Sequence, residues 1–413
     1  MKRFLLCIAL SSLVLGLTGP AQAAICDSDV KPAATLLLPY FEVDTVDSTG
    51  VNTVFSVNNA YETALLAHVT VWSDLSVPVF DFNVYLTGFD AQVFDLRDLL
   101  VNGLLPQTAS AGQDPADTIS PQGPLSADIN FASCVGQLPL PPTLPAVFVD
   151  HFKKSLTGQP SVILGGRCAG RDLGDGIARG YVTVDTVNNC TLRFASDVGY
   201  FGPGGDATNQ NALFGDYSIV DGKKSFGDNL VHIEASATDP ETSTAGQYTF
   251  YGRYVGWSAA DNREPLPTTF GARYVNDRSD LIVWRDSKVS QQSVTCPAGA
   301  GNPAWWPLNQ EAIVAFDEQE NPAFPGGKPF KVETQRVKVG GNALPVPFNS
   351  GWIYLNLNTA VAQAGANPPE DPSAAQAWVS VATRSADGKY TVGYDAMRYD
   401  SACHANHADP GGL

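Results

Sequence analysis

The side chains best suited to chemistry in this sequence are aromatic rings in loops rich in glycine and proline. Trp305 and Trp306 lie in the segment GNPAWWP, and Tyr200 and Phe201 precede the turn GPGG. Exposed rings on loops stack against sugars or anchor a protein partner. The alternative is that one ring of each pair packs into the core. We predict a binding surface for a glycan or a protein at these four residues.

A second candidate site is an acidic loop with the sequence FDEQENP, which contains Asp317, Glu318 and Glu320. Calcium takes six to eight oxygen ligands, and carboxylates in such a loop supply several of them. The loop lacks the spacing of the EF-hand motif, so a solvated acidic turn is the alternative. Calcium is therefore the one cofactor that the sequence suggests, at these three residues.

The sequence contains no recognised catalytic motif. It has neither a GxSxG nucleophile elbow nor an SxxK pair, and its five histidines are scattered. The chain has 42 acidic residues, so a nominal carboxylate pair carries little weight, because a glycosidase pair must face each other across ~5–9.5 Å. We expect a protein that is not an enzyme. A secreted hydrolase of polysaccharides that uses a carboxylate pair is the alternative, and a calcium-stabilised component of a surface layer or filament is the third reading.

The start of the chain has the pattern of a signal peptide. Lys2 and Arg3 precede an apolar run over residues 4–17, and the small-residue motif AQA ends at Ala23. We expect cleavage near Ala23 and a secreted location in the periplasm, at the cell surface or outside the cell. Removal of residues 1–23 leaves 42 acidic and 23 basic residues, a balance that disfavours nucleic acid and anionic membrane surfaces. No later run is long enough for membrane insertion.

Six cysteines remain after Cys7 is removed with the signal peptide. An even number in an exported chain indicates disulfides, and spacing alone does not decide their pairing. We expect the pairs Cys26–Cys190, Cys134–Cys168 and Cys296–Cys403, with Cys168–Cys190 as the main competing pair.

The elements that would position these residues are strands. In residues 65–71 and 80–86 apolar and polar side chains alternate, with Val69 and Val71, then Phe82 and Val84, on one face. A period of two is typical of strands with one buried face. Residues 145–156 have apolar side chains at helical spacing and two lysines near the end, which predicts one short helix.

Five segments recur in the same order along the chain, which predicts an internal duplication. We expect two domains, at residues 24–257 and 258–413, joined at the polar segment DNREPLP. The first is longer by roughly 80 residues, which predicts an insertion over residues 101–179 that contains the short helix. The matching segments are 35–40 with 269–274, 53–58 with 280–285, 66–74 with 312–319, 180–185 with 351–356, and 230–237 with 377–383.

Each predicted domain has about six or seven short strands separated by turns, as a β-sandwich requires. The fold class expected is all-β, with two tandem immunoglobulin-like antiparallel β-sandwich domains. The segments TLLLPYFEVD, SVNNA, DFNVYLTGFD and FDEQENP are similar to segments of exported bacterial proteins with immunoglobulin-like modules. The resemblance spans nearly the whole mature chain and implies this fold without a function. We therefore expect an exported binding or structural protein of the cell envelope or extracellular space.

Overall fold

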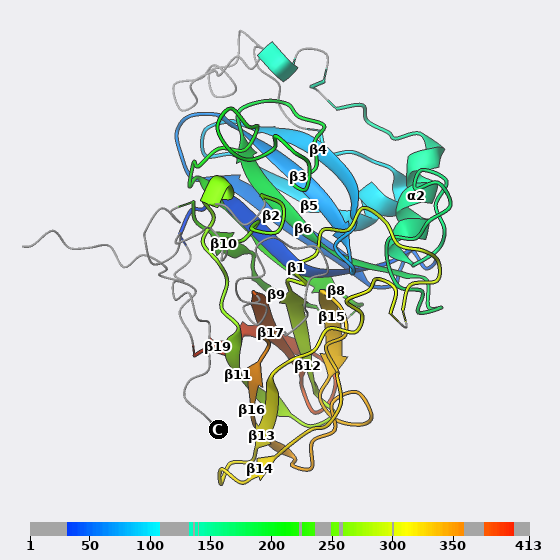
Figure 1. Ribbon diagram of the computed structural model, residues 1–413, viewed down its shortest axis with the longest axis vertical. Helices are drawn as coiled ribbons and strands as arrows, with labels where there is room; N and C mark the ends of the chain where they lie inside the picture. Colours follow the sequence, from blue (N-terminus) through cyan, green and yellow to red (C-terminus); the bar gives the residue numbers. More distant parts are fainter. Residues whose placement is uncertain are drawn as a thin grey trace, which may run out of the picture.

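The computed structural model describes residues 31–107, 132–134, 137–138, 140–222, 225–235, 249–255, 259–299, 301–358 and 376–399. The predicted signal peptide, Cys26, Cys403 and the predicted boundary at residues 257–258 lie outside the described residues. The fold is mostly β, with four antiparallel sheets (Figure 1). We call strands β1–β10 the first half of the fold and strands β11–β19 the second half.

The first half contains two sheets. One has the strand order β10-β1-β6-β3-β4, and the other has the order β5-β2-β8-β9, with β7 paired to β2. The strands are β1 (Thr35–Asp44), β2 (Asn52–Asn59), β3 (Leu65–Ser73), β4 (Pro78–Leu86), β5 (Ala91–Asp95), β6 (Ile177–Val187), β7 (Leu213–Phe214), β8 (Asp216–Val220), β9 (Phe226–Asn229) and β10 (Val231–Ile233).

The second half also contains two sheets. Their strand orders are β14-β13-β16-β11-β19 and β15-β12-β17-β18. The strands are β11 (Thr269–Val275), β12 (Ser279–Arg285), β13 (Ala312–Phe316), β14 (Pro322–Ala323), β15 (Thr334–Lys338), β16 (Ser350–Asn356), β17 (Ala377–Arg384), β18 (Thr391–Asp395) and β19 (Met397–Arg398). In Figure 1 these strands fill the lower part of the molecule, below β1–β6.

The alternation in the sequence correctly identifies the faces of β3 and β4 that form the core. Val69 and Val71 in β3 and Phe82 and Val84 in β4 share one hydrophobic cluster with Phe55 of the opposing sheet. The expectation of a single buried face is wrong for β3, because all nine of its residues are buried. Loops that include the aromatic residues Tyr200 and Tyr251 cover its second face.

Taken in chain order, the strands of the two halves are arranged in the same way. The order β10-β1-β6-β3-β4 corresponds to β19-β11-β16-β13-β14, and β5-β2-β8-β9 corresponds to β15-β12-β17-β18. The pairing register also agrees. Thr35 lies opposite Asp185 as Thr269 lies opposite Asn356, and Trp72 lies opposite Tyr181 as Phe316 lies opposite Trp352.

One of the five matched segments is placed wrongly by the sequence. Residues 230–237 contain β10, which pairs with β1, whereas residues 377–383 belong to β17, which pairs with β12 and β18. The position of β17 in its sheet corresponds to that of β8. Short apolar strands resemble one another in sequence, so only the pairing reveals the correct counterpart.

The segment between β5 and β6 contains the main helix. The predicted helix is confirmed as α2 (Ala146–Leu156), which buries Phe152 and Leu156 and leaves Val147 half exposed. The other helical turns are η1 (Asp98–Asn102), η2 (Ala132–Cys134) and η4 (Ala259–Asp261). Among the described residues, no helix has both the length and the apolar character needed to cross a membrane.

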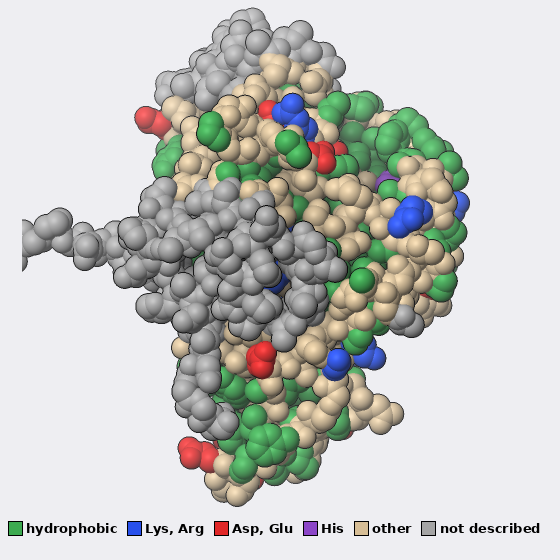
Figure 2. Space-filling model, in the orientation of Figure 1, with side chains coloured by type: hydrophobic (Ala, Val, Ile, Leu, Met, Phe, Trp, Pro, Cys, Tyr) green, Lys and Arg blue, Asp and Glu red, His purple; other side chains and the backbone are tan. Residues whose placement is uncertain are grey.

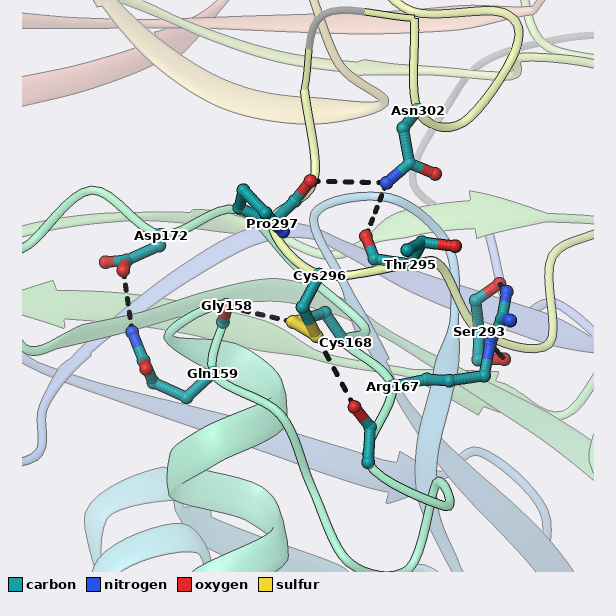
Figure 3. Close-up of a disulfide and its surroundings, with 11 residues drawn as sticks. Gly158, Gln159, Arg167, Cys168, Asp172, Ser293, Thr295, Cys296, Pro297 and Asn302 are labelled. Atoms are coloured by element: carbon teal, nitrogen blue, oxygen red, sulfur yellow. Dashed lines mark hydrogen bonds between the residues drawn. A yellow bond between two sulfur atoms is a disulfide. The ribbon is translucent and has the colours of Figure 1, made fainter.

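The disulfide pairs differ from those expected. Cys134 is bonded to Cys190 and Cys168 to Cys296, so the predicted pairs Cys134–Cys168, Cys26–Cys190 and Cys296–Cys403 are wrong, as is the competing pair Cys168–Cys190. The backbones of Cys168 and Val294 exchange two hydrogen bonds of 2.9 and 2.8 Å, which bring Cys168 beside Cys296 (Figure 3). This disulfide joins the segment that follows α2 to the loop that follows β12.

Candidate functional site

Of the predicted aromatic residues, Tyr200 lies in a buried polar network, and the partly buried Phe201 packs beside it. Tyr200 is fully buried, and its hydroxyl donates a 3.0 Å hydrogen bond to Asp185 in β6. Phe201 packs against Tyr251 with ring centroids 4.5 Å apart, and the Arg263 guanidinium lies over its ring. Packing against the sheet thus explains the burial of Tyr200.

The two tryptophans also differ in burial. Trp305 is 5 % exposed and packs with Cys168 and Leu308, beside the disulfide. Trp306 is partly buried, and the Arg171 guanidinium lies 5.7 Å from its ring centroid. Ligand binding by Trp306 and Phe201 stays a prediction, whereas Tyr200 and Trp305 have packing roles.

The acidic loop between β13 and β14 is held by its own hydrogen bonds. The Asp317 carboxylate accepts bonds of 2.9 Å from the backbone amides of Gln319 and Asn321 and one of 2.8 Å from the Asn321 side chain. The Asn321 side-chain bond, together with the backbone bonds, lowers the pKa of Asp317. Glu318 and Glu320 are exposed. Within the described ranges, no group of three or more acidic, histidine or cysteine side chains is arranged to hold a metal.

Asp185 is the centre of the buried network on the second face of β6. It accepts hydrogen bonds from the hydroxyls of Thr35, Tyr200 and Tyr251, and Arg263 lies 3.9 Å away. Burial raises the pKa of Asp185. Because its exposed fraction is zero, the network fixes the covering loops onto the sheet and offers no access to a substrate.

A serine–histidine pair that the sequence did not indicate lies beside α2. His151 Nδ1 is 2.6 Å from Ser161 Oγ, and His151 Nε2 is 3.1 Å from the Val79 carbonyl oxygen. Burial lowers the pKa of His151. A nucleophile and its base lie at such distances, but His151 is 3 % exposed and Ser161 is 1 % exposed. The pair therefore connects α2 to β4 and to the loop after the helix.

Asp228 in β9 and Asp395 in β18 form a carboxyl pair across the two halves. Asp395 accepts hydrogen bonds from Trp378 Nε1 at 3.1 Å and Ser380 Oγ at 2.9 Å. Burial, with the neighbouring Asp395, raises the pKa of Asp228 to about 7. Asp228 Oδ2 is buried and has no hydrogen-bond partner among the described residues, so the two carboxyl groups interact through their charges.

A groove of about 430 Å³ lies on one side of the second half, and we call it the arginine groove. The end of β11 contributes Arg273, the turn that follows contributes Arg278, and the end of β17 contributes Arg384. Tyr390, just before β18, and Tyr394, within β18, form the opposite wall. Basic side chains occupy a few separate small patches on the face of the molecule in Figure 2. The groove brings together three arginines and one carboxylate, that of Glu318 in the acidic loop, in a chain with a net charge of −17.

Two of these arginines have no acidic partner among the described residues. Arg384 lies 3.8 Å from Asp280 and donates to a backbone carbonyl. Arg278 donates through Nε to the Arg384 carbonyl oxygen at 2.9 Å, and Arg273 lies over the Tyr394 ring at 5.3 Å. The guanidiniums of Arg273 and Arg278 are thus available for a carboxylate or another oxyanion, which arginine binds with paired N–H donors.

Sequence reasoning missed the arginine groove, because its residues come from segments more than 100 positions apart. Only the pairing of β11, β17 and β18 into facing sheets brings them together. Comparison of the chain with models of protein families, with curated proteins and with solved structures finds no match. The geometry of the groove is therefore the basis for a functional argument.

Proposed function

We propose that this chain is an exported binding protein, without catalytic activity, that holds an acidic polypeptide surface in the arginine groove. The observation that carries the proposal is the pair Arg273 and Arg278, which line a groove with tyrosine rings. Glu318 also lines the groove, but neither arginine forms an ion pair with an acidic side chain in the described part of the chain. Charge-assisted hydrogen bonds from arginine to carboxylates are among the stronger polar contacts, and tyrosine contributes rigid contact area.

We further propose that the chain consists of two tandem immunoglobulin-like β-sandwich domains, at residues 24–257 and 258–413, with an insertion at residues 101–179. The shared strand order and register of the two halves support an origin by duplication. Export is supported by the pattern of residues 1–23, and the two disulfides suit an oxidising compartment.

The binding proposal is tested with a glutamate-rich peptide and a matched peptide in which serine replaces each glutamate. Titration calorimetry should detect binding of the acidic peptide alone. Replacement of both arginines, Arg273→Ala with Arg278→Ala, should weaken binding by about tenfold or more, which corresponds to about 1.4 kcal/mol. Arg167→Ala, which changes an exposed arginine outside the groove, is the control and should leave binding unchanged.

Equal binding of the two peptides, or full binding by the double variant, would overturn the proposal. Binding of an oligogalacturonate by the wild type without binding of the acidic peptide would also overturn it, because the groove would then select a glycan.

A further inference from the structure

The two halves of the fold contact each other in an asymmetric way. The sheet β15-β12-β17-β18 of the second half places its outer face against the first half, where Ile282 and Ala382 join the hydrophobic cluster of β1–β9. Thr334 in β15 donates to the Pro39 carbonyl oxygen in β1, and Arg336 donates to Glu42 at 3.2 Å. The first half thus receives the outer face of a sheet along β1.

The side of the first half that contacts this sheet is the edge of β1, and we call it the receiving side. β10 pairs with residues 35–37 of β1, and no other strand of the described residues lies beside the rest of β1 on that side within its sheet. In the second half, β19 pairs with Phe270 and Gly271, and within the described ranges no strand lies beside the remainder of β11 on that side. The corresponding edge of the opposing sheet is β9 in the first half and β18 in the second.

The arginine groove is the counterpart of this receiving side. It is lined by residues 273–275 of β11 and by Val392 and Tyr394 of β18. In β11, Arg273 lies opposite Trp352 in an unbroken register, whereas β1 has a register shift between Leu38 and Phe41 that contains Pro39 and Tyr40. The side that holds a sheet in the first half is, in the second half, a groove in which Arg273 and Arg278 have no acidic partner among the described residues.

The sheet that corresponds to the docked one is β5-β2-β8-β9. Its four strands contain neither lysine nor arginine. Of their three aspartates, Asp95 and Asp216 lie on the outer face, whereas Asp228 lies opposite Tyr217 on the buried face. On its outer face Asp216 is exposed and Val93 is 58 % exposed. This face has the acidic character that Arg273 and Arg278 require, and its strand arrangement is that of the sheet which already docks within the chain.

We infer that the outer face of the sheet β5-β2-β8-β9 of one copy docks in the arginine groove of a second copy. The inference rests on the proposed function, because it identifies the acidic polypeptide as another molecule of this chain. The two surfaces are different, so the contact is heterologous, and each added copy offers a further open groove. Copies therefore associate head to tail.

Sedimentation velocity on the exported chain, residues 24–413, tests the inference. The wild type should form species larger than a dimer as its concentration rises. A groove variant with Arg273→Glu and Arg278→Glu should remain monomeric, and so should a face variant with Asp216→Lys and Val93→Lys. The single variant Arg273→Glu is measured as well, in case the double variant fails to fold. This exposed side chain has its described contact with the Tyr394 ring, so its replacement leaves the core intact.

Mixing the two variants is the decisive step. The groove variant keeps an intact face and the face variant keeps an intact groove, so one native contact remains and the mixture should form heterodimers that grow no further. A wild type that stays monomeric at every concentration, or a mixture that stays monomeric, would overturn head-to-tail association. If the wild type stays monomeric and still binds the acidic peptide, the proposed function stands and only the second copy is excluded as partner. If it does neither, both proposals fail.

Discussion

Gly180 in β6 and Gly351 in β16 occupy the same position in two sheets that share their strand order. A Cβ added to Gly180 would lie 1.9 Å from the Trp72 carbonyl oxygen, and one added to Gly351 would lie 1.8 Å from the Phe316 carbonyl oxygen. Trp72 and Phe316 are themselves counterparts in the strand pairing. The same close approach of two strands therefore requires glycine in both halves.

Replacing either glycine should destabilise the fold. We expect Gly180→Ala and Gly351→Ala each to lower the free energy of unfolding by about 3 kcal/mol or more, because the added carbon overlaps backbone that cannot move aside cheaply. Gly326→Ala is the control, since an added Cβ meets no atom within 4 Å there. Urea denaturation followed by tryptophan fluorescence measures the difference. Stability equal to that of the control would contradict the equivalence of the two positions.

The disulfide Cys168–Cys296 should stabilise the fold more than Cys134–Cys190 does. The two bonds join cysteines 128 and 56 residues apart, and a longer closed loop restricts the unfolded chain more. On chain entropy alone the difference is roughly 0.7 kcal/mol. Denaturation of the double alanine variants of each pair measures it. Peptide mapping without reduction should recover both pairs, and a Cys168–Cys190 peptide would contradict the structure.

The pair Asp228 and Asp395 should make stability depend on pH. The pKa of Asp228 rises from its usual 3.8 to about 7 in the fold, so the folded chain keeps a proton that the unfolded chain releases between those values. The free energy of unfolding therefore falls as the pH rises through this window and becomes constant above it. Asp81, whose pKa burial also raises to about 7, contributes in the same direction.

Asp228→Asn isolates the contribution of this pair. The asparagine side chain is uncharged at every pH. The decrease in the free energy of unfolding between pH 5 and pH 8 should therefore be smaller than in the wild type by on the order of 1–2 kcal/mol. Asp81 titrates in both proteins and cancels in the comparison. Parallel profiles for Asp228→Asn and the wild type would rule out the raised pKa of Asp228.

Local patterns in the sequence predicted the elements of this fold better than their contacts. The alternation in β3 and β4 identified the core face, because a period of two follows from strand geometry alone. The helix α2 followed from the spacing of its apolar residues and its final lysines. The burial of His68 on the other face of β3 was not predictable in this way, since distant loops cover it.

The disulfides and the arginine groove depend on which strands become neighbours. Cys168 bonds to Cys296 because backbone pairing with Val294 brings the two segments together, and the spacing of cysteines contains no trace of that pairing. Arg273 and Arg278 face β18 only because β17 connects β12 to it. A residue-by-residue search for charged clusters in the sequence therefore finds the acidic loop at Asp317 and misses the groove.

Arg285 should be among the least replaceable residues of the second half. It is fully buried at the end of β12 and donates to the carbonyl oxygens of Phe330, Leu357 and Asn309, the first two at 3.1 and 2.6 Å. A lysine has a single ammonium group and does not reproduce a planar fork that reaches three loops. We expect Arg285→Lys to lower the free energy of unfolding by about 3 kcal/mol, because buried carbonyls lose their donors. Arg193→Lys, at a half-exposed arginine paired with Asp206, should change it by less than ~0.5 kcal/mol. Equal denaturation midpoints for these two variants would show that the three carbonyls find other donors.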